Sequence, residues 1–157
     1  MSGGVADAGS PRRVLCLHGW RTNPDVMKFQ ASELARRLPR CSLHFMQARV
    51  QQPEACDATI ASSFDGPFFA HWNISSTPDA MNEEVAATVR YVAEYVAQHG
   101  PFHAVIGFSQ VCSARVSALL VSCRRRKLTL VWSGNRAQGL RDCSLRCRAI
   151  IPCIPFR

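Results

Sequence analysis

Apolar residues along this chain of 157 residues fall into short unbroken runs and longer periodic stretches. The runs at 14–17 and 102–106 are typical of strands buried on both faces of a parallel sheet. Residues 42–46 and 128–132 predict two further strands. Between these runs the apolar residues recur every three or four positions, which predicts helices.

Three helices are expected from this spacing. Asn23 and Pro24 provide a cap and a first-turn proline, and the apolar repeat then runs to Leu38, so one helix is predicted over 24–38. The clearest helix begins at Thr77-Pro78-Asp79 and ends at Gly100-Pro101. Its sheet-facing side is predicted to carry Met81, Val85, Val89, Val92 and Val96. A third helix is predicted over 111–122.

Strands that alternate with helices predict an α/β fold built from right-handed β-α-β units, with a mostly parallel sheet and helices on both faces. Residues 47–76 contain no convincing periodic element, and a connection of that length is usually functional or mobile. Four aromatic residues in it either cover a cleft or form a satellite cluster under a loop: Phe64, Phe68, Phe69 and Trp72.

The run at 102–106 ends in Gly107-Phe108-Ser109, which suggests a nucleophile elbow, the turn that lifts a catalytic serine above a sheet. The full pattern is Gly-X-Ser-X-Gly, and Val111 occupies the last glycine position. A β-branched residue there is expected to open the turn or tilt the next helix. The alternative is an ordinary strand followed by a turn.

Length and composition predict one domain. We expect a flexible start over 1–12, a partial hydrolase-like domain over 13–134 and a poorly ordered basic Cys/Arg-rich tail over 135–157. Residues 1–111 hold 9 Lys and Arg against 10 Asp and Glu, whereas residues 112–157 hold 10 against Asp142 alone. This abrupt change favours a spliced or frame-shifted tail, although a divergent natural ending is the alternative.

No signal or membrane-spanning segment is visible, so a cytoplasmic location with reduced cysteines is expected, and an additional nuclear location is the alternative. No Gly-rich phosphate loop is present, and no cofactor is expected. Cys143, Cys147 and Cys153 lack the paired spacing of a zinc site, so no metal is expected either. The basic run 124–127 leaves nucleic-acid binding as an alternative, without an aromatic stacking platform beside it.

Three stretches, RVLCLHGWRTN with FQASEL, GPFFAHWN and GPFHAVIGFSQ, resemble the family of serine hydrolases, small members of the α/β-hydrolase superfamily. The resemblance covers Arg13 to Gln110 and implies an esterase or thioesterase acting on small-molecule acyl substrates. It implies Ser109 as nucleophile and an oxyanion hole made of the backbone N–H groups of Gln110 and of Trp20 or its neighbour, so the side chains there are expected to matter less.

The triad acid and histidine of this superfamily follow the serine, yet no histidine follows Ser109 and Asp142 is the only acid there. His103 is expected at the far end of the sheet, and His18 in the oxyanion loop. His71 is the one candidate for a substitute base. The chain is therefore expected to lack the last strands of the fold and to be an impaired hydrolase. The open alternatives are a non-catalytic ligand- or partner-binding relative and a basic-tail interaction protein, and the oligomeric state stays undetermined.

Overall fold

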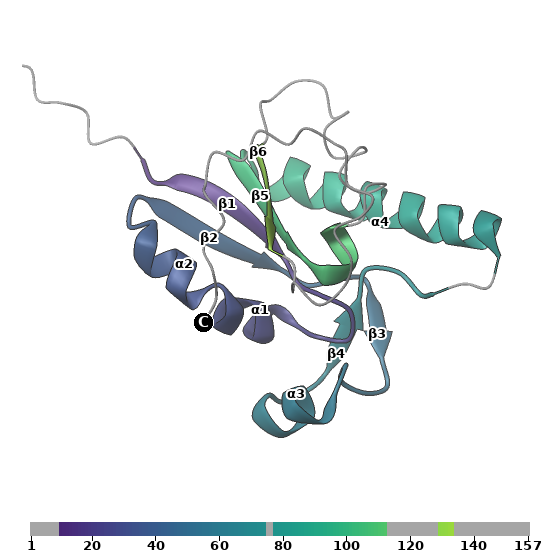
Figure 1. Cartoon of the computed structure of the whole chain (residues 1–157). Helices are drawn as coiled ribbons and strands as arrows, with labels where there is room; N and C mark the ends of the chain where they lie inside the picture. The colour runs from purple at the N-terminus through teal and green to yellow at the C-terminus, as the bar shows by residue number, and fades with distance from the viewer. Residues whose placement is uncertain (1–9, 75–76, 113–128, 134–157) are drawn as a thin grey trace, which may run out of the picture.

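The computed structural model describes residues 10–74, 77–112 and 129–133, and these form a parallel sheet with helices on its two faces (Figure 1). The predicted fold class, α/β with a mostly parallel sheet, is confirmed. The strands are β1 (Arg12–Leu17), β2 (Cys41–Met46), β3 (Val50–Gln52), β4 (Phe68–Ala70), β5 (Ala104–Phe108) and β6 (Thr129–Ser133). The helices are α1 (Pro24–Gln30), α2 (Ser32–Arg37), α3 (Ala58–Ser63), α4 (Pro78–His99) and the 3₁₀ turn η1 (Ser109–Cys112).

Four parallel strands form the main sheet, in the order β2-β1-β5-β6. The two central strands, β1 and β5, pair Leu17 with Gly107, so their carboxyl ends lie side by side. The strand predicted at 102–106 is in fact displaced by two residues. Phe102 is buried before the strand begins, and Gly107 and Phe108 still belong to the sheet.

Alternate residues of the central strands face opposite layers, which explains why these strands are continuously apolar. Leu15, Leu17 and Val105 pack with the buried side of α4, whereas Val14, Cys16 and Ile106 pack with Met27 of α1. The two helices lie on opposite faces of the sheet (Figure 1). The sheet is therefore covered on both sides, as a parallel sheet requires. None of the helices in the described residues has the length and apolar character needed to cross a bilayer.

The helix predicted over 24–38 is interrupted at Ala31, where ψ is 1°. Val26 and Met27 of α1 are buried, but α2 has no buried residue. Its apolar positions are half-buried or exposed, so the repeat seen in the sequence does not mark one continuous buried stripe. The long helix agrees with the prediction, apart from Thr88, which is buried where Val89 was expected.

Residues 47–76 were predicted to lack regular elements, and this is wrong for the described part. β3 and β4 pair as an antiparallel hairpin. The helix α3, capped by Asp57, belongs to the chain segment that connects the two strands. Phe68, Phe69 and Trp72 are buried, and Trp72 belongs to the main core under α4. Trp72 therefore packs in the main core, which is neither of the two alternatives, and the burial of Phe68 and Phe69 favours packing over covering a cleft.

Only residues 111–112 of the predicted third helix are among the described residues, and they belong to the 3₁₀ turn η1 instead of an α-helix. β6 lies within one residue of the predicted fourth strand. The remainder of the third helix, the basic run 124–127, the tail 135–157 with its three cysteines, and residues 1–9 lie outside the described residues. The predicted domain boundaries stay predictions.

Candidate active site

Ser109 lies at the junction of β5 and η1, and its backbone adopts φ of 53°. A positive φ is uncommon for a residue with a side chain and costs about 1–3 kcal/mol. The strand therefore turns sharply at this residue, and Ser109 is exposed at the carboxyl end of the sheet.

Gly107 and Val111 fit each other across this turn. A Cβ atom on Gly107 would lie 2.8 Å from Cγ2 of Val111, and Val111 is buried against the core. The valine at the last glycine position of the elbow pattern is thus accommodated because residue 107 has no side chain.

The loop after β1 approaches the same turn. A Cβ atom on Gly19 would lie 3.4 Å from Cβ of Ser109 and 3.2 Å from Cδ1 of Phe108. The loop also contains Arg21, at φ 51°, the second non-glycine residue with positive φ among the described residues. Strained backbone is common at functional sites. Here both strained residues belong to loops that meet at the carboxyl ends of β1 and β5.

Side chains fix the position of this loop. Thr22 donates its hydroxyl to the Gly19 carbonyl at 2.8 Å, and its own carbonyl accepts the N–H of Phe69 at 2.7 Å. Asn23 caps α1 through Val26 N–H at 3.0 Å and donates to the Asp65 carbonyl at 2.9 Å. The guanidinium of Arg21 lies 4.4 Å from the Trp20 ring centroid and forms an ion pair with Glu54. The loop is thus tied to the β3–β4 hairpin at several points.

His18 is buried and holds part of the same loop. Its Nε2 accepts the N–H of Ala48 at 3.0 Å, which places the proton on Nδ1. That Nδ1–H lies 2.8 Å from the Gly19 carbonyl and 3.1 Å from Thr22 Oγ1. Burial lowers the pKa of His18, and the hydrogen bond to Gly19 opposes this shift. His18 is accordingly a satisfied neutral histidine within the loop.

His71 follows β4 and is completely buried. Its Nε2–H donates to the His18 carbonyl at 3.0 Å, so Nδ1 carries a lone pair, buried without a hydrogen-bond partner among the described residues. Burial, followed by the nearby His18, lowers the pKa of His71 to about 3. A nitrogen with so low a pKa is a poor proton acceptor near neutral pH. This geometry does not suit the substitute base considered from the sequence.

The other described histidines lie away from Ser109. Nδ1 of His103 accepts the N–H of Arg13 at 3.1 Å, next to the amino end of β5, as expected. His44 lies in β2, where Nε of Arg13 donates to its Nε2 at 3.2 Å. The His99 ring lies against the Tyr95 ring at the last turn of α4, tilted by 42°. None of the three is in a position to assist the serine.

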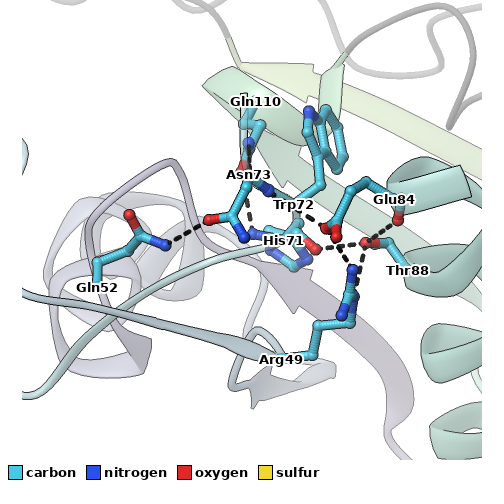
Figure 2. A network of polar contacts seen from close by, with 8 residues as sticks. All are labelled: Arg49, Gln52, His71, Trp72, Asn73, Glu84, Thr88 and Gln110. Carbon is cyan, nitrogen blue, oxygen red and sulfur yellow. Dashed lines mark hydrogen bonds and ion pairs between the residues drawn. The ribbon is translucent and has the colours of Figure 1, made fainter. Parts of the chain in front are cut away.

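Gln110 contributes more than the backbone N–H expected of it. Its side-chain Oε1 accepts the N–H of His71 at 3.0 Å, and its Nε2 donates to the Trp72 carbonyl at 2.8 Å (Figure 2). No pattern in the sequence indicates this contact, because both partners are backbone groups almost forty residues away. The predicted site residues Ser109, Gln110 and Trp20 are thus all carried by the two loops that meet at Gly19.

A surface depression lies near this network. An open depression beside α4 is lined by Arg49, Asn73, Ile74, Ala80, Glu83, Glu84, Ala87 and Arg90, and Ser109 is not among its lining residues.

Within residues 10–74, 77–112 and 129–133, no group of three or more His, Cys, Asp or Glu side chains is placed to hold a metal ion. Cys16, Cys41 and Cys56 are free thiols.

Comparison with known proteins agrees with the resemblance read from the sequence. The chain is 29% identical to Esterase FUS5 of Gibberella moniliformis over 112 residues, which cover 69% of this chain and 48% of the esterase. It is 26% identical over 110 residues to an uncharacterized hydrolase of Schizosaccharomyces pombe, covering 62% and 26%. Esterase alnB of Emericella nidulans is 28% identical over 109 residues, covering 69% and 36%.

The chain therefore spans about half or less of the length of these curated relatives. The family model described as serine hydrolase (FSH1) matches residues 7–141, which is most of the chain. With that match and the parallel α/β sheet, the chain belongs to the serine hydrolase (FSH1) family.

Proposed function

We propose that this chain carries the nucleophile and the oxyanion hole of a serine esterase or thioesterase acting on small acyl substrates, with Ser109 as the nucleophile. The observation that carries the proposal is the exposed Ser109 at φ 53°, at the end of a central strand and against Gly19. A strained, exposed serine at the end of a central strand is what a nucleophile elbow requires, and it supports the proposal. Two relatives that are named esterases, and the family itself, support the same class of reaction.

In the proposed reaction, Ser109 Oγ attacks the carbonyl carbon of the substrate, and the carbonyl oxygen becomes an oxyanion. The backbone N–H groups of Gln110 and Trp20 are assigned to bind that oxyanion. The alcohol or thiol then leaves, and water releases the acyl group from Ser109.

The proton of Ser109 needs an acceptor in the first step. No histidine follows Ser109 in these 157 residues, and the described histidines are held elsewhere. We therefore expect turnover about 10⁴ to 10⁶ times slower than with a complete triad, leaving what binding and the oxyanion hole contribute.

A fluorophosphonate probe tests the proposal without needing turnover. Ser109 Oγ forms a bond to phosphorus, the P–F bond breaks, fluoride leaves, and the hydroxyl proton passes to water. The purified chain should label slowly, and Ser109→Ala and the heat-denatured chain should not label. Labelling that survives in Ser109→Ala, or none in the folded wild type, would contradict the assignment. The latter result would favour a non-catalytic ligand-binding relative.

A further inference from the structure

The side-chain amide of Gln110 forms hydrogen bonds with two consecutive residues of the segment after β4. It accepts the N–H of His71 and donates to the carbonyl of Trp72, at 3.0 and 2.8 Å. An amide side chain offers a donor and an acceptor side by side, as the backbone of a neighbouring strand would. The turn that carries Ser109 is therefore attached to the segment after β4 by a two-point contact (Figure 2).

Three of the four polar groups of His71 form hydrogen bonds, and only Nδ1 has no partner among the described residues. Its N–H donates to Gln110, its carbonyl accepts the hydroxyl of Thr88 in α4, and its Nε2–H donates to the His18 carbonyl. Because its pKa lies at about 3, the ring stays neutral above that pH and keeps a single proton. The hydrogen bond to the His18 carbonyl requires that proton on Nε2, so the ring keeps the same tautomer at every pH well above 3.

The His18 contact reaches the loop that bears the second proposed oxyanion donor. The His18 carbonyl is held by His71, and the next carbonyl, of Gly19, is held by His18 Nδ1–H and the Thr22 hydroxyl. In a trans peptide the C=O and the following N–H point in opposite directions. Fixing the Gly19 carbonyl therefore fixes the direction of the Trp20 N–H.

We infer that the side chains of Gln110 and His71 form a positioning clamp that holds the Ser109 turn and the His18–Trp20 loop in one fixed relation. This inference rests on the proposed function, because it concerns the two proposed oxyanion donors. Gln110 is then a positioning residue through its side chain, in addition to its backbone N–H. The expectation that side chains at these positions matter little does not hold for residue 110.

The first test compares the rate of fluorophosphonate labelling in matched variants. Gln110→Met removes both contacts, and Gln110→Glu keeps the acceptor for His71 N–H but sets an oxygen against the Trp72 carbonyl. Gln52→Met is the control, because Gln52 is only half-buried and donates to the Asn73 side chain in the same network, without touching Gln110 or His71. A displacement of about 1 Å at a reacting site costs about 100-fold in rate, so we expect at least a tenfold loss of kinact in both Gln110 variants.

The affinity for the probe, KI, should stay within about threefold in these variants, because the clamp acts on the geometry of the reaction. Gln52→Met should label like the wild type. Equal kinact for the wild type and Gln110→Met would overturn the clamp, as would a loss confined to KI.

The second test is independent of chemistry at Ser109. Backbone ¹⁵N order parameters of Gly19 and Trp20 should be near 0.85 in the wild type and in Gln52→Met, and should fall toward about 0.6 in Gln110→Met. Leu15, inside β1, serves as the internal reference. Unchanged values at Trp20 would refute the clamp even if Ser109 labels. A wild type that fails to label would refute the nucleophile, while the order parameters still decide the clamp.

Discussion

A methyl group added at Gly107 should destabilise the turn that carries Ser109. In Gly107→Ala the new Cβ would lie 2.8 Å from Cγ2 of Val111, whereas ordinary contacts begin near 3.4 Å. Val111 is buried in the core beneath α4, so it has little freedom to move away. Overpacking of this kind costs about 1–3 kcal/mol of the free energy of unfolding.

Removing the opposing methyl groups should reverse the penalty. Val111→Ala alone should cost about 1–2 kcal/mol, because it deletes buried methyl groups. In the Val111→Ala background, Gly107→Ala should cost close to nothing, because its methyl group then occupies the vacated space. The coupling energy between the two positions is thus expected to be about 1–3 kcal/mol, the whole cost of Gly107→Ala in the wild type.

Urea unfolding of the four proteins in the cycle, followed by circular dichroism, measures this coupling energy. Thermal midpoints should follow the same order, with about 2–4 °C for each kcal/mol. Strict additivity of the two substitutions would show that Gly107 and Val111 do not share the space described. It would remove the explanation for the tolerance of valine at this position.

Three further predictions follow from the same contacts. His71→Gln keeps a donor near the position of Nε2, so its rate of fluorophosphonate labelling should stay within about threefold of the wild-type rate. His71→Leu has no such donor, and its labelling rate should fall at least tenfold. If neither variant were labelled, His71 would be acting as a base. Burial holds the pKa of His71 near 3 in the folded chain, against 6.5 when unfolded, so the unfolded chain binds more protons below pH 6.5. The free energy of unfolding should therefore fall by up to about 1.4 kcal/mol per pH unit from pH 6.5 toward pH 3. Urea midpoints between pH 7 and pH 4 should decline less steeply in His71→Gln than in the wild type. Asn23→Ala loses the cap of α1 and the bond to the Asp65 carbonyl and should cost about 2 kcal/mol in urea unfolding. Gln52→Met, at a half-buried position, is the control and should stay within about 0.5 kcal/mol of the wild type; equal midpoints for the two variants would contradict the prediction.

The central strands and the long helix could be predicted because local patterns determine them. Leu15 and Leu17 alternate with Val14 and Cys16 between two buried faces, which makes the sequence continuously apolar. The long helix has a threonine cap, a first-turn proline and a regular apolar repeat. Its one misplaced residue, Thr88, is buried because its hydroxyl bonds to the His71 carbonyl, which is a tertiary contact.

The hairpin and the clamp could not be predicted from local patterns. β3 and β4 have three residues each, and pairing between Val50 and Ala70 depends on a partner twenty residues away. Gln110 has backbone partners, so no side-chain type in residues 71–72 announces the contact. The turn at Ser109 was predictable from its motif, but the fit of Val111 depended on the space above Gly107.

The order of strands in the sheet has a consequence for how the chain is made. β1 pairs on one side with β2, which ends at residue 46, and on the other with β5, which begins at residue 104. At a synthesis rate of about 5–20 residues per second, β5 leaves the ribosome roughly 3–12 s after β2. During this interval β1 presents an unpaired apolar edge, the kind of surface that chaperones bind, and the pairing that closes it also brings Ser109 to Gly19.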